Sequence, residues 1–397
     1  MLTLDNVYRA SYALKNVIRK TDVIYAPKLA EGVELYLKTE NLQTTGSFKI
    51  RGACYKMSRL SPTEKEKGVV ACSAGNHAQG VALAAKKNGI KAVICLPDGA
   101  PISKVEATKS YGAEVCLVEG VYDDAYQKAL QLRDEKGYTF IHPFNDEDVI
   151  AGQGTIALEL SEQIPDLDAV IVPIGGGGLI SGIAYTIKSL NPNVKVYGVQ
   201  ASGAPSMKKS LEDGKIEELS SVSTIADGIA VKQPGNLTYE ICQKYVDEIV
   251  TVSDDEISAA ILALMEKHKL VTEGAGAVAV AAAMFGKVDI KGKKAVCVLS
   301  GGNIDVTILS RVIKRGLLMS GRNCQLMIEL VDKPGQLKDV SRIIADLGGN
   351  VTSVHHERAN EGSDVNGCYL RIILETRNYE HIAEIKKALT DHGFKLV

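Results

Sequence analysis

One lysine in an apolar setting is the residue of this chain that most directly suggests covalent chemistry. Lys49 lies between Phe48 and Ile50 in the segment T-T-G-S-F-K-I-R-G-A (44–53). A lysine near the start of a helix is usually a solvated surface residue. Here the apolar neighbours would disfavour the ammonium form and favour the uncharged amine, which can form a Schiff base with an aldehyde. Lys49 is therefore a candidate nucleophile.

A glycine run follows an apolar strand pattern and precedes a helical one. Gly175 to Leu179 come directly after residues 169–174, and the helical pattern starts near Ile180. Backbone N–H groups at such a junction can approach a phosphate closely, although a plain glycine turn is the alternative. A nicotinamide dinucleotide site is disfavoured, because Ile180 stands where the third glycine of G-x-G-x-x-G belongs and the next strand ends in Gln200 rather than an acid.

Two further loops of small and polar residues follow predicted strands. S-A-G-N-H (73–77) could hold a carboxylate with the N–H groups that open the next helix, although Ser and Asn are also ordinary helix N-caps. S-G-G-N (300–303) follows the strand pattern at 295–299. Three such loops at three strand ends predict one site that holds a phosphate-bearing cofactor.

The elements that position these loops alternate between strand and helix patterns from residue 32 onward. We predict strands at 33–37, 69–72, 91–96, 114–118, 138–141, 168–174, 194–199 and 295–299, separated by segments of helical length. This alternation predicts an α/β fold with parallel strands and helices on both faces. Such sheets place ligands at the carboxyl ends of their strands.

The pattern changes after residue 321. Strands at 325–331, 351–358, 368–375 and 394–397 combine with helices that end near 347 and that span 379–391. This β-α-β-β-α-β order is that of a ferredoxin-like α+β unit. We therefore predict two domains, 1–321 and 322–397.

Composition narrows the class of protein. The net charge is −2, so the chain lacks the excess of Lys and Arg that nucleic-acid binding proteins use. The longest nearly apolar stretch, residues 275–285, is too short to span a membrane. We expect no secretory leader, because the start M-L-T-L-D-N carries Asp5 and no apolar run. The eight cysteines lie at least 18 residues apart, often in apolar runs. We expect a cytoplasmic protein whose thiols are small buried hydrophobic groups.

Six motifs, in this order along the chain, carry a resemblance to known protein families. They are S-F-K-I-R-G-A (47–53), S-A-G-N-H-A-Q-G (73–80), G-G-G-G-L (175–179), A-D-G-I-A-V-K-Q-P-G (226–235), L-S-G-G-N (299–303) and D-K-P-G-Q-L (332–337). The first five resemble the threonine dehydratases, which depend on pyridoxal 5′-phosphate, and the last resembles the ACT regulatory domain attached to many of them. The resemblance implies a fold type II catalytic region, similar to the tryptophan synthase β subunit, followed by an ACT domain.

The resemblance also implies roles for particular residues. Lys49 would bind the cofactor covalently, Phe48 would pack on its pyridine ring, Asn76 would bond its phenolic oxygen, and Ser300 would face its pyridine nitrogen. The phosphate would lie against Gly175, Gly176, Gly177, Gly178 and Leu179, and the substrate carboxylate against Ser73, Ala74, Gly75, Asn76 and His77. An effector would contact Gly335, Gln336 and Leu337.

The implied reaction is the dehydration and deamination of L-threonine to 2-oxobutanoate and ammonia, with L-serine as a second substrate. A neutral hydroxyl at Ser300 cannot act as counterion to a pyridinium, so the ring would be a weaker electron sink and prompt loss of a β-substituent would be favoured. The alternatives are a serine racemase or serine dehydratase and, from another class, a non-catalytic amino-acid sensor.

The second domain implies regulation by an amino acid or a nucleotide. Inhibition by isoleucine or valine is the family's usual pattern in branched-chain synthesis, and nucleotide activation belongs to catabolic relatives. The domain could instead be an oligomerisation module without a ligand, and a homodimer or homotetramer is expected. We expect no metal site: Gln200 and Ser206 stand where related racemases place acids, and the adjacent His355 and His356 would point to opposite faces of a strand.

Overall fold

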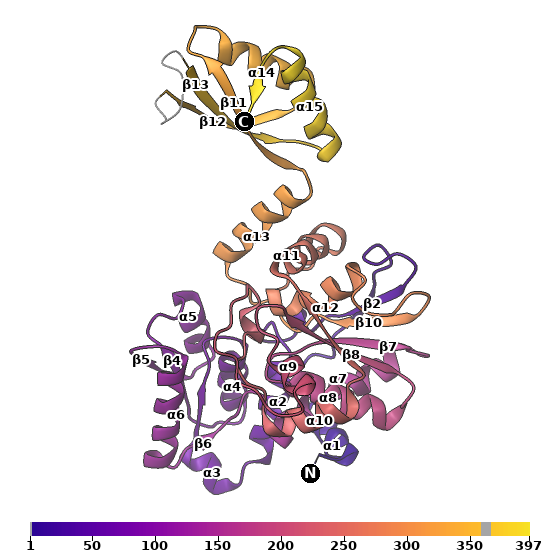
Figure 1. Ribbon diagram of the computed structural model, residues 1–397. Helices are drawn as coiled ribbons and strands as arrows, with labels where there is room; N and C mark the ends of the chain where they lie inside the picture. Colours follow the sequence, from indigo (N-terminus) through magenta and orange to yellow (C-terminus); the bar gives the residue numbers. More distant parts are fainter. Residues whose placement is uncertain (1, 359–366) are drawn as a thin grey trace. The chain divides into compact units, whose positions relative to one another are not determined.

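The computed structural model describes residues 2–358 and 367–397, and the chain divides into two compact units, Met1–Ile308 and Leu309–Val397 (Figure 1). This division falls near the start of helix α13 (Val306–Met319). The functional boundary that the sequence places at 321 stays a prediction.

Two sheets form the frame of the first unit. The larger has the strand order β1 (Val23–Tyr25), β2 (Glu34–Lys38), β10 (Lys294–Val298), β7 (Ala169–Pro173), β8 (Lys195–Ala201), β9 (Glu248–Val252). The smaller has the order β5 (Glu114–Val118), β4 (Ala92–Pro97), β3 (Val69–Cys72), β6 (Thr139–Phe140). Every pair is parallel except β1 with β2, which confirms the predicted parallel α/β region. The sequence analysis missed β1 and β9.

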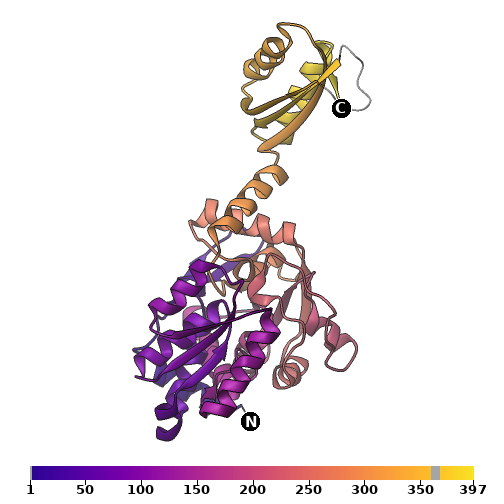
Figure 2. The ribbon, with the colours of Figure 1, turned by 90° about the vertical axis from the view of Figure 1, so that its left-hand side faces the viewer.

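Helices cover both faces of these sheets, as Figure 2 shows for the smaller one. All four residues of β3 are buried, because Val69 and Ala71 belong to one apolar cluster and Val70 and Cys72 to another on the opposite face. The helices of this unit are α1 (Leu4–Leu14), α2 (Lys49–Arg59), α3 (Pro62–Lys67), α4 (Asn76–Lys87), α5 (Ile102–Ser110), α6 (Tyr122–Lys136), α7 (Glu147–Gln163), α8 (Gly178–Leu190), α9 (Ser206–Glu212), α10 (Asn236–Tyr245), α11 (Asp254–Ala263) and α12 (Gly274–Met284).

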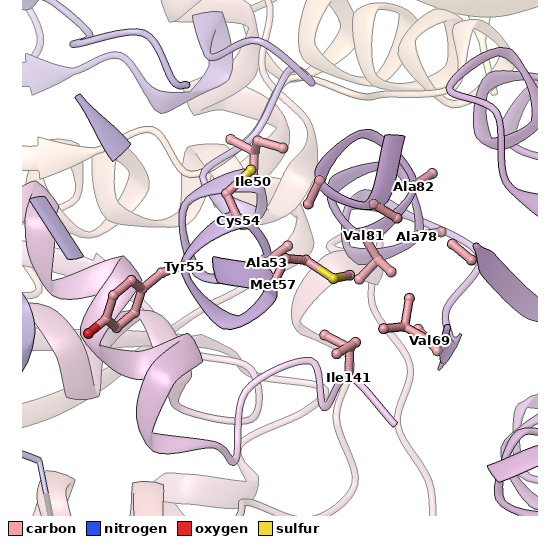
Figure 3. Packing of buried hydrophobic residues seen from close by; sticks show 14 of the residues in the cluster. Ile50, Ala53, Cys54, Tyr55, Met57, Val69, Ala78, Val81, Ala82 and Ile141 are labelled. Carbon is pink, nitrogen blue, oxygen red and sulfur yellow. The ribbon is translucent and has the colours of Figure 1, made fainter. Parts of the chain in front are cut away.

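The packing of α2 against α4 places two of the predicted loops side by side. Their apolar side chains meet in one cluster, which includes Ile50, Ala53, Met57, Ala78, Val81 and Ala82 (Figure 3). A Cβ at Gly80 of α4 would lie 3.1 Å from the carbonyl carbon of Lys49, so glycine is what lets the two backbones come this close. The start of α2 is thereby fixed next to the start of α4.

The second unit has the predicted ferredoxin-like order. Its antiparallel sheet runs β12 (Asn350–Glu357), β13 (Gly367–Glu375), β11 (Asn323–Val331), β14 (Lys395–Leu396), with helices α14 (Gln336–Asp346) and α15 (Tyr379–Asp391). Residues alternate between buried and more exposed along β11 and β13, because one face packs on the helices.

The helices and the cysteines bear on the expectations for a membrane span and for disulfide bonds. Among the described residues, no helix combines the length and the apolar character that crossing a membrane requires. All eight cysteines are free thiols, and seven of them are buried.

Candidate active site

Lys49 begins α2 and has few partners for a charged group. Its Nζ donates a hydrogen bond to the carbonyl oxygen of Pro143 at 2.8 Å and lies 5.3 Å from the centroid of the Phe48 ring. Part of the side chain remains exposed, but the amine lies deep among protein atoms. Loss of hydration lowers the pKa of Lys49 to about 8, although the carboxylate of Glu273 acts in the opposite direction. Roughly a tenth of this amine is therefore uncharged at pH 7, far more than for an ordinary lysine.

The glycine loop leaves its N–H groups available. Gly177 is the N-cap of α8 with a φ of 97°, and the first N–H that bonds back into the helix is that of Ser181, which donates to the Gly177 carbonyl. In the part of the chain that the structure describes, we find no protein acceptor for the N–H groups of residues 175–179. Such a row of amides at a helix N-terminus is suited to a phosphate.

The glycines also allow the loop to pack tightly against the segment that holds Lys49. A Cβ at Gly176 would collide with the Phe144 ring, and one at Gly178 would lie 2.8 Å from the Phe144 Cα. Phe144 follows Pro143, the hydrogen-bond partner of the Lys49 amine. The loop and the lysine are thus connected through two consecutive residues.

The loop at 73–77 opens α4 without a side-chain cap. Gly75 is the N-cap, and the Ser73 hydroxyl accepts a hydrogen bond from the Gly75 N–H at 3.2 Å. The N-cap interpretation of Ser73 and Asn76 is therefore wrong. His77 is buried with its Nε2 2.8 Å from the Ile141 carbonyl oxygen, and burial lowers its pKa to about 3. A neutral His77 leaves backbone N–H groups and the helix dipole as the features of this loop that attract an anion.

Asn76 is the centre of a hydrogen-bond chain that joins three loops. Its Nδ2 donates to Glu273 Oε1 at 2.6 Å, and its Oδ1 accepts from Asn303 Nδ2 at 2.7 Å. Asn303 Nδ2 also donates to the Thr45 carbonyl at 2.8 Å. Both ends of the Asn76 amide are therefore oriented, which is what a residue that bonds a cofactor oxygen requires.

Sequence analysis assigned no role to Glu273 or Asn303. Glu273 precedes an apolar helix and looks like an ordinary acidic helix start, and its partner Asn76 is 197 residues away. Asn303 closes the motif L-S-G-G-N, which was a signal that could have found it. Burial raises the pKa of Glu273 to about 7, and the charge of Asp227 adds to this, while the hydrogen bond from Asn76 opposes it.

Ser300 follows β10 and is hydrogen-bonded to the residue before Lys49. Its Oγ is buried and donates to the Ala275 carbonyl at 3.2 Å, and its own carbonyl accepts from the Phe48 N–H at 3.1 Å. The loop after β10 is thereby tied to the residue that precedes Lys49. Contacts within the first unit thus bring together Phe48, Lys49, Asn76 and Ser300.

Two hydroxyls close to Lys49 in the chain are buried without a partner. Thr45 Oγ1 and Ser47 Oγ accept and donate no hydrogen bond within the described residues. Ser47 pairs by its backbone with Gly301. Buried polar atoms that lack partners are uncommon in folded proteins.

The predicted effector residues belong to the second unit. Gly335, Gln336 and Leu337 line a cavity of about 420 Å³ at the turn between β11 and α14.

The chain matches known protein families in both of its parts. Residues 14–301 match the family model described as pyridoxal-phosphate dependent enzyme, and residues 325–391 match the ACT domain. The chain belongs to the pyridoxal-phosphate-dependent enzymes. It is 50% identical to an L-threonine ammonia-lyase of Thermotoga maritima over all of this chain and 99% of that protein. An L-threonine ammonia-lyase of Geobacter sulfurreducens is 44% identical over 99% of this chain and 98% of its own length.

Solved structures show the same fold. The processed threonine deaminase isoform 2 of Solanum lycopersicum aligns with a TM-score of 0.75 at 40% identity, covering 79% of this chain and 89% of that one. The maize serine racemase aligns with a TM-score of 0.75 at 36% identity, covering 80% of this chain and 98% of its own. The first unit therefore has the fold type II architecture expected from the sequence.

The residues present fit pyridoxal phosphate. The cofactor needs an amine for its aldehyde, amide donors for its phosphate, and polar partners for its ring. The poorly hydrated Lys49 amine, the unbonded N–H groups of 175–179, and the oriented Asn76 and Ser300 side chains supply these.

Proposed function

We propose that this enzyme is an L-threonine ammonia-lyase, which converts L-threonine to 2-oxobutanoate and ammonia and also accepts L-serine. The observation that carries the proposal is the Lys49 amine, held in a poorly hydrated position beside an amide-rich loop, in a chain that matches L-threonine ammonia-lyases over its whole length.

Pyridoxal phosphate, when bound, supplies an electron sink that acidifies the Cα hydrogen of an attached amino acid and assists departure of the β-substituent. In this proposal Lys49, Phe48, Asn76 and Ser300 hold its reactive ring. Gly175, Gly176, Gly177, Gly178 and Leu179 hold its phosphate.

Lys49 is the base in this proposal. An amine whose pKa lies near 8 can take up the Cα proton at Nζ, and it can return the proton later, because both forms are accessible near neutral pH. The Pro143 carbonyl, which accepts from Nζ, orients the lone pair and stabilises the protonated form.

The loop Ser73, Ala74, Gly75, Asn76 and His77 holds the substrate carboxylate. A helix N-terminus presents N–H groups to an anion, and the neutral His77 adds no charge that would trap the product. The Ser73 hydroxyl, which already accepts from Gly75, is left free to donate.

Departure of the β-hydroxyl requires a proton. Ser47 Oγ and Thr45 Oγ1 are buried hydroxyls without partners among the described residues, two and four residues from Lys49. In this proposal the proton comes from the cofactor phosphate or from a nearby hydroxyl group. Ser300, as a neutral group at the ring, favours elimination over reactions that need a long-lived carbanion.

An assay of the purified holoenzyme tests the proposal. L-threonine and L-serine are supplied in turn, with and without a chelator, and 2-oxoacid, ammonia and D-serine are measured. We expect 2-oxobutanoate and ammonia in equal amounts from L-threonine, and pyruvate more slowly from L-serine. D-serine as the main product would favour the racemase, and bound amino acid without turnover would favour the sensor.

We further propose that the second unit regulates the first. Its cavity at Gly335, Gln336 and Leu337 would take an amino-acid or nucleotide effector, and the enzyme would work as a homodimer or homotetramer. We place the enzyme in the cytoplasm, where free thiols stay reduced. By linkage, an effector that weakens substrate binding must itself bind more weakly when substrate is present.

Truncation tests this division of roles. The catabolic L-threonine dehydratase TdcB of Escherichia coli is 49% identical over 78% of this chain, and 96% of its own length aligns. A relative can thus lack a segment of roughly the size of the second unit. We expect residues 1–321 to deaminate L-threonine at a rate within a few-fold of the full chain and to lose all effector response. Loss of catalysis would show that the second unit is needed for folding or assembly.

A further inference from the structure

Three potential metal ligands of different chemistry lie together in the second unit. Asp332 follows β11, His356 lies on β12 and Cys368 on β13. One ligand atom from each, a carboxylate oxygen, a ring nitrogen and Sγ, lie within 4.8 Å of one another. His356 Nε2 is 2.9 Å from Cys368 Sγ.

Strand register explains why these side chains share one face of the sheet. Cys368 pairs with Leu330, and Asp332 stands two residues beyond Leu330. His356 pairs with Leu370, which stands two residues beyond Cys368. Since residues two apart in a strand and directly paired residues lie on the same face, His356 and Cys368 lie on the face that also carries Leu330 and Leu370. Asp332, just beyond the end of β11, has its carboxylate within 4.8 Å of both ligand atoms.

We propose that Asp332, His356 and Cys368 bind one divalent cation of the zinc type. A thiolate, an imidazole and a carboxylate form a mixed donor set that suits Zn²⁺ and disfavours Mg²⁺ or Ca²⁺, which prefer oxygen. Three protein ligands leave a fourth tetrahedral position for water or for a ligand in the cavity of about 420 Å³ that these residues help to line.

The geometry needs only small adjustments. At ordinary zinc distances a sulfur and a nitrogen ligand stand about 3.6 Å apart in a tetrahedral site. The observed 2.9 Å between Nε2 and Sγ must open slightly, and the carboxylate must move inward. Cys368 is buried in its strand and fixed, whereas Asp332 and His356 are exposed and can rotate to meet the ion.

Binding of the ion must break one ion pair and remove one proton. Asp332 Oδ2 is paired with Arg358 Nε at 3.1 Å, and the ion would compete with this guanidinium. The thiol must release its proton; burial and Asp332 raise the pKa of Cys368, while Arg358 lowers it. Each bound ion should therefore release a proton from Sγ.

This inference departs from the expectation of no metal site. That expectation rested on local spacing, and it noted that His355 and His356 would face opposite sides of a strand. The same alternation selects His356 alone as a ligand and leaves His355 on the other face, near Ser353 Oγ at 3.0 Å. His355 is thus a matched control.

The experiment uses the full-length holoenzyme after removal of metals with a chelator. Equilibrium dialysis against Zn²⁺ with elemental analysis gives the stoichiometry and the affinity. Co²⁺ serves as a second probe, because its visible d–d bands report tetrahedral coordination and lie apart from the cofactor absorption. Cys368→Ser and His356→Asn remove ligands, and Cys324→Ser and His355→Asn remove a buried thiol and an imidazole of the same unit that are not ligands.

We expect one Zn²⁺ per chain for the wild type and for both controls. Even outer partners of metal sites contribute about 10–100-fold to affinity, so each ligand variant should bind at least about 100-fold more weakly and lose the cobalt bands. Denaturant unfolding followed by circular dichroism should be the same for all variants as for the wild type, which checks that the second unit is folded, and deamination of L-threonine should also be unchanged. Substoichiometric binding, unchanged binding by Cys368→Ser, or equal losses in the controls would overturn the proposal.

Discussion

Two cationic side chains two residues apart on α2, Arg51 and Lys49, differ in their ion-pair partners and in the direction in which their pKa is shifted. Arg51 is completely buried and pairs with Glu40 at 2.7 Å and with Glu159 at 2.7 Å, with a further hydrogen bond to Thr155. Lys49 has one carbonyl oxygen and one ring as its neighbours. The two carboxylates raise the pKa of Arg51 despite burial, whereas burial alone lowers the pKa of Lys49.

The difference separates a structural charge from a reactive amine. A buried ion that is fully paired stays charged, and its partners depend on it. A buried amine without a carboxylate in contact is easily deprotonated and so becomes a nucleophile and base. The ion cluster at Arg51 holds the helix whose first residue is Lys49, so one turn of α2 contains both the anchor and the reactive group.

Removal of the reactive amine should have the largest effect. We expect Lys49→Ala to lower kcat for L-threonine at least about 10⁴-fold, because both the covalent attachment and the base are lost. The free energy of unfolding of the apoenzyme at neutral pH should not fall, since a poorly hydrated ammonium group contributes no stability there. Steady-state 2-oxoacid formation and denaturant unfolding measure the two.

Lys56→Ala on the same helix is the matched control. Lys56 pairs with Asp146 and Asp148 at 2.8 and 3.1 Å and makes no contact with the site. It should retain activity within a few-fold. A Lys49→Ala enzyme that still produced 2-oxobutanoate would contradict the assignment of the base.

The contrast also shows what the sequence could reveal. Lys49, the glycine loop and the loop at 73–77 were predictable because their signals are local: apolar neighbours, small residues and a strand before a helix. The partners of Arg51 were not, since Glu40 and Glu159 lie 11 and 108 residues away in the sequence. Strand β1 was missed for a related reason, because three residues at an antiparallel edge give too short a pattern.

Removal of the anchor should have the second-largest effect, and on stability rather than chemistry. Arg51→Met leaves Glu40 and Glu159 buried without their main cation, which should cost about 3–5 kcal/mol of unfolding free energy. Chemical denaturation followed by circular dichroism measures this. Lys20→Met, which breaks an exposed pair with Glu162, should cost less than about 1 kcal/mol.

A second substitution sharpens the result. In Glu40→Leu with Arg51→Met, the remaining Glu159 keeps Lys38 Nζ at 2.6 Å, so no carboxylate is left unpaired. The double variant should recover part of the lost stability. If the single variant were as stable as the wild type, the cluster would not be the anchor of α2.

The smallest effect is expected at Glu273, whose negative charge raises the pKa of Lys49 and so opposes the effect of burial. Its carboxylate favours the ammonium form of Lys49, so Glu273→Gln should lower the pKa of Lys49 below about 8 while keeping an acceptor for Asn76. Capture of pyridoxal phosphate by the apoenzyme needs the uncharged amine. The pH midpoint of its capture rate, followed by absorbance, should therefore shift downward by less than about one unit, since the charge is one of several acting on the amine.

Stability should change with pH in a way that only the wild type shows. The folded-state pKa of Glu273, about 7, lies above its ordinary value of 4.5, so the folded protein holds this proton more tightly than the unfolded chain does. The resulting stabilisation is complete below pH 4.5 and is lost as the pH rises to about 7. Unfolding of the two apoenzymes at pH 5 and 8 should show the wild type losing more stability than Glu273→Gln between these values. Parallel losses, together with an unchanged capture midpoint, would mean that Glu273 titrates alike in the folded and unfolded chain and that its charge does not act on Lys49.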